Sequence, residues 1–600
     1  MEPPLTKDDF LNTDWQTVVD GSERKDCVTY SLAFWPKAQA ARDAGNATEE
    51  IVFAVLACIT GAAIRPESTE EFFAETFANL TNAHLDFLTE IASEIDDPEL
   101  QARVADILWV RQRNHQMAML AIAAYLQSAI ALESSEDWVN CCERIERALA
   151  LASWISHRKD DVLAHIETVL DRHQGEDRPY LLAEMMKLLL RHQHGETAKY
   201  TALSEQAARL AEANAEWWWA RDLWSIKAAW HHQGKDISQR TAAAMAAAET
   251  YVCEAEAALE RTPPSYMVAA HFLQDAVVAF RNVPGTKEET AAAKARAKEV
   301  QKRLLLYQEE IPNEMVQISS STVDVRELAE MATNSVRCKS LHDALFALAC
   351  LGAPIKVAQL RQQVQQYAKD FVLHRLFPTV MMNEMGRVVA RQPASMLSSD
   401  SEEAEAATRF EMCQHASYHH DLHAQACVEH ARCQINLEHN VRVNDILFII
   451  QHSPFVPPGR EYLFAKGLHA GLTGDFFTSM HLLIPQIENS VRYLLWQRGE
   501  ITSGLDTRGI QNEHNLNDTL YRPETAAMFG ENMVFDLKCL LVEHAGSNMR
   551  NRIAHGLMGD GEFLCAKASY LWWLVSRLCL FPLLRAQQED KQTGESPGKT

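Results

Sequence analysis

Residues Leu181–His192 read LLAEMMKLLLRH, and their apolar side chains recur at three- and four-residue steps. This spacing places them on one face of an α-helix, whereas a half-buried strand would alternate apolar and polar residues with a period of two. Most long windows of the chain share the helical spacing, for example Ala270–Val283, AHFLQDAVVAFRNV. We therefore expect an all-α protein.

Short breaks such as HQGEDRP and RTPPS separate these helical windows between Ile51 and about Gln308. Helices joined in this way usually pack as antiparallel hairpins, so we expect a solenoid-like N-terminal region of the tetratricopeptide kind. The period is irregular, and generic helical packing without a true repeat is the alternative.

A chain of 600 residues is too long for one hydrophobic core. We expect an N-terminal helical domain over 1–210 and a second, repeat-like helical region over 211–392, whose last helical set runs from Thr322 to about Arg391. The polar, acidic stretch QPASMLSSDSEEAEAA predicts a linker over 393–408. A further helical domain follows over 409–584, and residues 585–600, which offer almost nothing apolar to bury, predict a disordered tail.

The formal net charge of −24 opposes non-specific association with polyanions, so a nucleic-acid coat protein is disfavoured. Thirteen irregularly spaced cysteines and the absence of an apolar leader indicate reduced thiols and a cytoplasmic location. The most apolar late stretch, Tyr570–Leu584, is shorter than a bilayer span and contains Arg577. We interpret it as a buried closing helix and expect no membrane association.

The hexapeptide Arg550–His555, RNRIAH, has the spacing of arginine, four residues and histidine, which Arg337–His342 shares. Such a short spacing occurs by chance, so its context decides. Gly546 can end the preceding helix, and Ser547 or Asn548 can cap a new one, so that the hexapeptide starts a helix. Free backbone amides and the helix dipole at that position would suit a phosphate.

Three side chains of this hexapeptide suit cleavage of RNA without a metal. Asn551 and His555 are four residues apart and share a helical face, whereas Arg550 reaches it only by bending its arm or by serving a neighbouring chain. A composite site in a twofold homodimer would supply that arginine. His555 would act as base or acid, and Arg550 would stabilise the phosphorane charge. Alternatively, both side chains only bond carbonyls and carboxylates.

The segment from Ser453, SPFVPPGREYLFAKGLHAGLTGDFFTSMHLLIPQIENSVRYLLWQRGE, and MFGENMVFDLKCLLVEHAGSNMRNRIAHGL carry a resemblance. Over roughly 413–584 the chain resembles the helical domain of the ER-membrane-associated RNA degradation protein and its bacterial relatives, which belongs to the HEPN superfamily. The resemblance implies a helical bundle over 409–584 and a metal-independent endoribonuclease that leaves a 2′,3′-cyclic phosphate, with an Arg-polar-x-x-x-His motif at a dimer interface. Arg550, Asn551 and His555 fit that motif.

Three further residues could support such a site. Glu488 and Arg492 are four apart on a predicted helix over 480–498, where an ion pair is the simpler interpretation. As part of the resembled bundle, Glu488 could instead orient His555. Arg460 follows the rigid turn SPFVPPGRE and could bind a second phosphate, although capping or pairing is the simpler role.

Two other groups have a structural and a functional interpretation. His419, His423, Cys427 and His430 could line one helical face and bind zinc, but a single helix rarely supplies a whole tetrahedral shell, so we expect no metal. Trp217–Trp219 could stack on bases, but three consecutive rings point around most of a helix, which favours packing. No glycine-rich phosphate loop or dinucleotide motif is present, and we expect no cofactor.

The leading hypothesis is a regulated endoribonuclease in RNA degradation or antiviral defence, including toxin action. Its N-terminal helices would recognise a protein partner or signal. The alternative is an inactive scaffold that uses the same bundle for dimerisation or partner binding. The two hypotheses differ at His555, which should be open to solvent in a nuclease and enclosed by apolar side chains in a scaffold.

Overall fold

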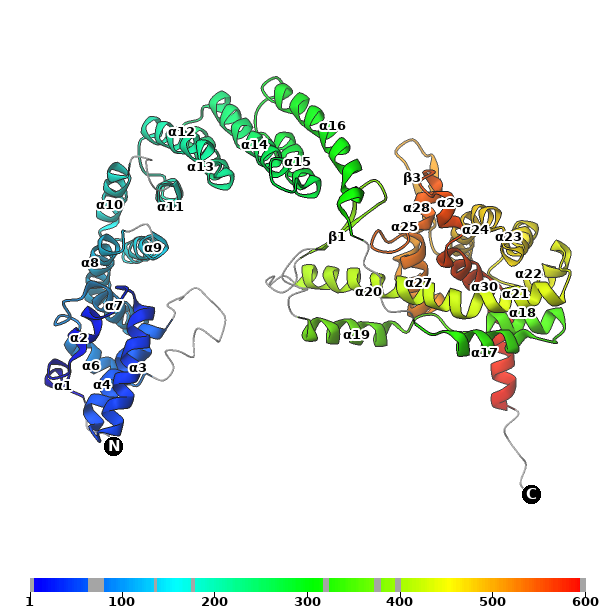
Figure 1. The fold of residues 1–600 in the computed structure, drawn as a ribbon, viewed down its shortest axis with the longest axis horizontal. Coiled ribbons are helices and arrows are strands. Elements are labelled where there is room, and N and C mark those ends of the chain that lie inside the picture. The colour runs from blue at the N-terminus through cyan, green and yellow to red at the C-terminus, as the bar shows by residue number, and fades with distance from the viewer. Residues whose placement is uncertain are drawn as a thin grey trace. The chain divides into compact units, whose positions relative to one another are not determined.

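The computed structural model describes residues 5–62, 80–133, 138–173, 179–316, 323–371, 379–393 and 401–593. The chain forms two compact units, residues 1–314 and residues 315–600. Nearly all regular structure is helical, which confirms the predicted all-α class, and two short antiparallel hairpins lie in the second unit (Figure 1).

Unit 1 is built of helices joined by short turns, and most consecutive helices lie side by side (Figure 1). Its helices are α1 (Lys7–Leu11), α2 (Trp15–Asp20), α3 (Cys27–Asp43), α4 (Ala47–Gly61), α6 (Asn82–Ile91), α7 (Pro98–Gln112), α8 (His115–Ala131), α9 (Trp138–Trp154), α10 (Lys159–Arg172), α11 (Pro179–Arg191), α12 (Thr197–Ala213), α13 (Trp217–Gln233), α14 (Ile237–Leu259), α15 (Tyr266–Arg281) and α16 (Ala291–Glu314).

The predicted domain boundary at 210/211 falls inside α12, and the structure shows no break there. One cluster of buried residues continues from Ala102 to Ala247, so the packing of helix on helix passes through this position. In the neighbouring α13, Trp219 packs against Trp138 and Tyr180, with ring centroids 6.1 and 5.7 Å apart. Trp218 is 57% exposed, so the predicted packing of the tryptophan triplet holds for Trp219 but not for Trp218.

Unit 2 contains a helical bundle and both hairpins. Its elements are α17 (Arg326–Val336), α18 (Leu341–Ala349), α19 (Val357–Asp370), β1 (Thr379–Met382), β2 (Val388–Gln392), α20 (Ser401–His423), the π-helical turn η2 (Ala424–Val428), α21 (Glu429–Glu438), η3 (Val443–Ile446), α22 (Leu447–Ile450), α23 (Glu461–Thr473), α24 (Phe476–Gln497), β3 (Ser503–Leu505), β4 (Gln511–Glu513), α25 (Leu516–Leu520), α26 (Pro523–Phe529), α27 (Glu531–Leu541), α28 (Met549–Ala554), α29 (Asp560–Phe563) and α30 (Ala566–Thr593).

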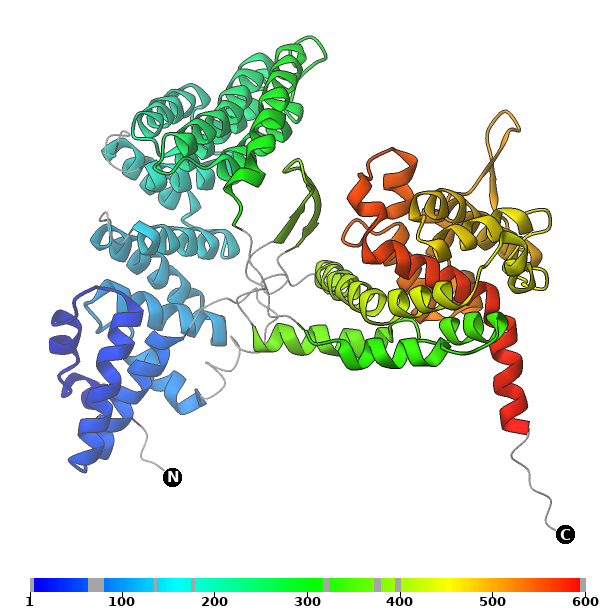
Figure 2. The same cartoon turned by 45° about the vertical axis from the view of Figure 1, so that its right-hand side comes forward.

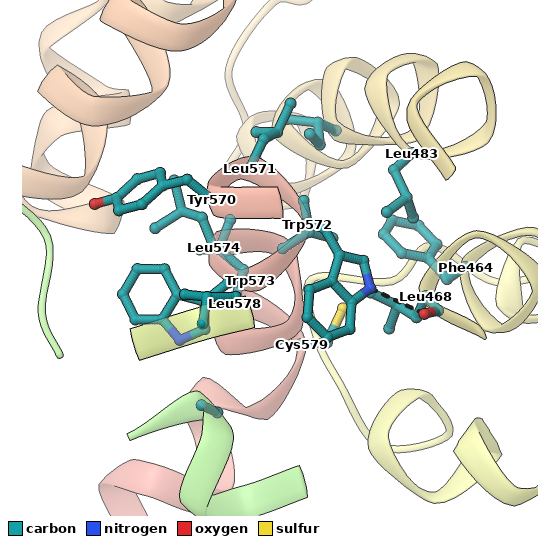
Figure 3. Packing of buried hydrophobic residues seen from close by; sticks show 14 of the residues in the cluster. Phe464, Leu468, Leu483, Tyr570, Leu571, Trp572, Trp573, Leu574, Leu578 and Cys579 are labelled. Atoms are coloured by element: carbon teal, nitrogen blue, oxygen red, sulfur yellow. Dashed lines mark hydrogen bonds between the residues drawn. The ribbon is translucent and has the colours of Figure 1, made fainter. Parts of the chain in front are cut away.

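The closing helix α30 lies at the centre of this bundle (Figure 3). Trp572 and Trp573 are buried, and each indole donates a hydrogen bond of 2.9 Å to a backbone carbonyl, that of Leu468 and that of Leu348 respectively. Burial of such large rings stabilises the bundle strongly when the indole N–H keeps a hydrogen-bond acceptor. The interpretation of Tyr570–Leu584 as a buried helix is thus confirmed as far as residue 580. Among the described residues, no helix combines the length and hydropathy needed to cross a bilayer.

Residues 379–392 form a hairpin, so the prediction of helix up to Arg391 is wrong there. The side-chain oxygen of Asn383 accepts the backbone N–H of Arg387 at 2.9 Å, and Gly386 has a φ of 67°. Asp506 and Gly509, with a φ of 81°, form the same turn in the β3–β4 hairpin, which projects from the bundle (Figure 2). Such turns reverse the chain locally and override weak helical periodicity.

The predicted acidic linker and tail are partly helical. Residues 401–408 begin α20, and residues 585–593 continue α30. Glutamate and alanine are strong helix formers, so an acidic composition without glycine or proline permits a helix as readily as a linker. Residues 394–400 of the predicted linker and residues 594–600 of the predicted tail lie outside the described residues.

The histidine and cysteine positions considered for zinc do not converge. The π-helical turn Ala424–Val428 shifts the helical phase, so that Cys427 is buried while His430, in α21, is exposed. His419 and His423 stack with their ring centroids 6.2 Å apart. Within the described ranges, no three potential ligands of a metal ion come together.

The neighbouring His420 has a structural role that the sequence pattern did not indicate. Its Nε2 lies 3.1 Å from the Asp536 carboxylate, which also accepts the Tyr570 hydroxyl at 2.9 Å and the Ile355 backbone N–H at 3.3 Å. His420 and Asp536 are 1% and 0% exposed. This buried network joins α20, α27 and α30.

We expect His423 to make unit 2 sensitive to acid. Burial, together with His419, lowers the pKa of His423 from 6.5 to about 4, and its Nε2 is buried without a hydrogen-bond partner. Above pH 6.5 neither the folded nor the unfolded state binds a proton there. Between pH 6.5 and 4 only the unfolded state does, so the free energy of unfolding should fall by about 3 kcal/mol.

Urea unfolding of the full chain at pH 7 and pH 4.5 measures this effect. His423→Gln should lose less stability between the two pH values than the wild type, whereas His430→Gln, at an exposed position, should behave like the wild type. Equal losses in all three proteins would contradict the assignment to His423.

Candidate functional site

The turn between α27 and α28 positions the hexapeptide. The backbone N–H of Ser547 donates to the carbonyl of Cys539 at 2.8 Å, which folds the chain back onto the end of α27. A Cβ at Gly546 would lie 2.1 Å from the same carbonyl oxygen, so only glycine fits. Gly546 therefore lies in the tight turn after α27 and directs the chain into α28.

Helix α28 begins at Met549, which confirms that Arg550 and Asn551 lie in its first turn. Asn548 is the N-cap residue, as one of the two predicted alternatives has it, but with a φ of 48° its side chain accepts no backbone N–H of the helix. Its Oδ1 instead accepts the Nδ2 amide of Asn551 at 2.7 Å. The helix has only six residues, so the expected phosphate environment from its dipole is weak.

His555 ends α28, and its backbone N–H donates to the carbonyl of Asn551 at 3.1 Å. The two residues are therefore one helical turn apart, as the spacing predicts. The imidazole is exposed, and it makes no hydrogen bond to any described residue. His555 is thus open to solvent rather than enclosed by apolar side chains.

Arg550 is held by Glu488 of α24. Its Nε lies 2.9 Å from the Glu488 carboxylate, and its Nη1 donates to the side-chain oxygen of Asn551 at 2.9 Å. Arg492 shares the same carboxylate at 2.9 Å, which confirms the predicted ion pair of Glu488 with Arg492. Glu488 forms no hydrogen bond with His555. Arg492 also pairs with Glu513 at 3.7 Å, so the cluster holds two guanidinium groups and two carboxylates.

The charged side chains of this cluster are partly buried, which restricts their motion. The side chains of Glu488 and Arg550 are 15% and 25% exposed. Partial burial reduces screening by solvent, and a network of charges holds its geometry better than an isolated surface pair. We infer that Glu488 fixes the direction of the Arg550 guanidinium, a role that neither sequence interpretation assigned to it.

The structure does not bring Arg460 into this cluster. Arg460 is the exposed residue before α23, and its side chain forms no hydrogen bond with Arg550, Asn551 or His555. The second arginine–histidine spacing is not a site either, because Arg337 ends α17 whereas His342 lies in α18 and packs on Phe448 at 3.9 Å.

Arg552 is a residue of the hexapeptide that the sequence interpretation did not use. Its guanidinium binds both carboxylate oxygens of Glu562, with 2.7 Å from Nη2 to Oε2, and donates to the carbonyl of Leu557 at 3.1 Å. Burial opposes ionisation of Glu562, but the hydrogen bonds from Arg552 and from the Gly559 N–H outweigh it and lower the pKa of Glu562. This pair fixes the loop that follows His555.

Residues 1–164, which end within α10, match a family model described as a domain of unknown function, DUF7380. The match lies wholly in unit 1 and does not reach residues 413–584. A search of curated proteins finds no match to this chain.

Proposed function

We propose that unit 2 is a metal-independent endoribonuclease of the HEPN type. The observation that carries the proposal is the exposed His555, which lies one turn from Asn551 on a helix whose Arg550 is fixed by Glu488. This arrangement combines an accessible proton-transfer group with a localised positive charge. Together with the resemblance, it favours RNA cleavage over a purely structural role.

The chemistry assigns one role to each side chain. His555 takes the proton of the ribose 2′-hydroxyl, or donates one to the leaving 5′-oxygen. The guanidinium of Arg550, oriented by Glu488, stabilises the negative charge of the phosphorane. Asn551 offers its amide to a phosphate oxygen after release from Asn548. The products are a 2′,3′-cyclic phosphate and a 5′-hydroxyl.

A homodimer would complete this site, because one His555 supplies either the base or the acid but not both at once. Leu557 and Leu564 are 64% and 62% exposed in the segment that follows His555. Exposed apolar residues beside a polar site are typical of an interface. A second copy of unit 2 seated there brings the partner's His555 to the same phosphodiester.

The acidic chain and unit 1 would restrain the enzyme. With a net charge of −24, the protein repels bulk RNA except where local cations gather. Unit 1 offers stacked helical hairpins, an architecture typical of binding to proteins. We assign to it the recognition of a partner or signal in RNA degradation or in defence against viruses.

The test is incubation of the purified full chain with single-stranded RNA in EDTA. We expect fragments that end in a 2′,3′-cyclic phosphate, and we expect no cleavage of a strand in which every ribose is replaced by deoxyribose. Cleavage that requires a divalent metal, or that leaves a 3′-hydroxyl, would contradict the proposed mechanism.

A second candidate is an inactive scaffold that dimerises or binds partners through the same bundle. The observation that favours it is the engagement of Arg550 within the protein, since each of its three guanidinium nitrogens donates one hydrogen bond to Glu488 or Asn551. A dimer in solution without any cleavage of RNA, under all the conditions above, would support the scaffold.

A further inference from the structure

A cavity of about 710 Å³ is lined by the β1–β2 hairpin, the turn before α28, α28 itself and the segment 557–567. The hairpin is anchored to α20, because Gln392 donates to Glu411 at 2.7 Å and Gln414 donates to the Met381 sulfur at 2.7 Å. The volume falls in the range typical of sites for small ligands.

Two polar groups of this cavity lack a partner. The Nε of Arg387 and the hydroxyl of Ser547 are both buried and form no hydrogen bond with any described residue. Arg387 also forms no ion pair there, whereas the lining cations Arg552 and Lys567 bind carboxylates. A buried guanidinium N–H without an acceptor is unfavourable, and the Nε of Arg387 is such a donor, so an anionic oxygen bound in the cavity would satisfy it.

The position of Arg387 is fixed by the turn described above, since its backbone N–H donates to Asn383 at 2.9 Å and its carbonyl accepts the Asn383 N–H at 2.9 Å. The turn therefore fixes the point from which the Arg387 side chain enters the cavity lining. A guanidinium without an ion pair there is available to an anion, because no protein carboxylate has to be displaced on binding.

The rest of the lining is rich in methionine. Thioethers are flexible and polarisable, and they pack favourably against flat aromatic rings. Polar side chains share the lining with the methionines, so the cavity offers both hydrogen-bonding groups and an apolar surface. The methionines of the lining are Met381, Met382, Met385, Met549 and Met558.

We propose that this cavity binds a nucleotide, with the phosphate on Arg387 and Ser547 and the base among the methionines. Met549 and Arg552 belong to α28, so the occupant lies beside the helix that carries Asn551 and His555. The nucleotide is either one unit of the RNA strand that the site cleaves or a free mononucleotide. The first source rests on the proposed function, whereas binding itself does not require cleavage.

Methyl NMR of the full chain with ¹³C-labelled methionine methyl groups tests the site. AMP should shift the signals of the five lining methionines, assigned by Met→Leu substitutions, and leave the other methionines unchanged. Adenosine and inorganic phosphate should each bind at least tenfold more weakly than AMP. Absence of binding at millimolar AMP, or inorganic phosphate binding as tightly as AMP, would overturn the proposal.

Charge variants in one hairpin give the matched comparison. Arg387→Gln should weaken AMP at least tenfold, whereas Arg391→Gln, an exposed position of β2, should leave the affinity unchanged. Thermal unfolding midpoints report whether either variant loses its fold, and the methyl shifts of the wild type test the site independently. Equal affinities for both variants would refute the role of Arg387.

An adenylate hexamer in the His555→Ala background distinguishes the two sources. Hexamer binding at least tenfold tighter than AMP, with the same methyl shifts, assigns the cavity to the RNA strand; tighter binding of AMP assigns it to a free nucleotide. If AMP binding depends on Arg387 but the wild type cleaves no RNA, only the proposed nuclease function is refuted. If the wild type cleaves RNA but AMP binding does not depend on Arg387, only the proposed nucleotide site in the cavity is refuted.

Discussion

Replacing His555 with alanine should lower the rate of RNA cleavage in EDTA by about 10³-fold, since a positioned acid or base contributes roughly that factor. The fold should be unaffected, because the imidazole is exposed and bonds to no described residue. A denaturing gel of end-labelled RNA measures the rate, and urea unfolding measures the stability. The expected result is a large loss of rate at constant stability.

His452→Ala is the matched control, because His452 is exposed in the turn after α22 and lies outside the proposed site. It should cleave at the rate of the wild type. Undiminished cleavage by His555→Ala would remove the imidazole from the mechanism, whereas equal loss in both variants would indicate a general effect on the protein.

The carboxylate of Glu488 explains how one cluster can satisfy both a structural and a catalytic requirement. Without it, Arg492 and Arg550 would repel each other, and Arg550 would search many rotamers before meeting a phosphate. With it, the two guanidinium groups share one acceptor, and the direction of the Arg550 guanidinium is fixed. A phosphodiester can then bind the remaining N–H groups of a guanidinium that is already oriented. Less side-chain entropy is lost on binding than with a mobile arginine.

Much of the fold follows from periodicity that the sequence displays. Helices with long apolar stripes, such as α24 and α30, bury those stripes as predicted, because no other arrangement removes them from water. The hairpins at 379–392 and 503–513 were missed, since each depends on a local turn. The signal was present: Asn383 and Asp506 both precede a glycine by three residues, with β-forming or polar residues on either side.

The candidate site was partly predictable for a similar reason. The first-turn position of Arg550 and the one-turn separation of Asn551 and His555 are local properties, and both agree with the structure. The contact of Arg550 with Glu488 joins residues far apart in the chain, as does that of His420 with Asp536. No periodicity encodes such contacts, because they depend on how the helices pack.

Gly546→Ala adds one methyl group, and we expect it to destabilise the protein more than the same change at any other glycine near the site. Its Cβ would lie 2.1 Å from the carbonyl oxygen of Cys539, and this is backbone that cannot rotate away. The turn must open and lose the Ser547–Cys539 hydrogen bond, so we expect the free energy of unfolding to fall by about 3 kcal/mol. Displacement of α28 should also lower RNA cleavage at least tenfold, because small errors in position are costly in catalysis.

Gly559→Ala is the control for Gly546→Ala, since a Cβ at Gly559 meets no atom within 4 Å and its φ of −81° suits any residue. It should keep both the stability and the cleavage rate of the wild type. Urea unfolding and the RNA assay of each variant give the comparison. Wild-type behaviour of Gly546→Ala would mean that the turn yields without moving α28, and that the tight approach to Cys539 does not set the position of the hexapeptide.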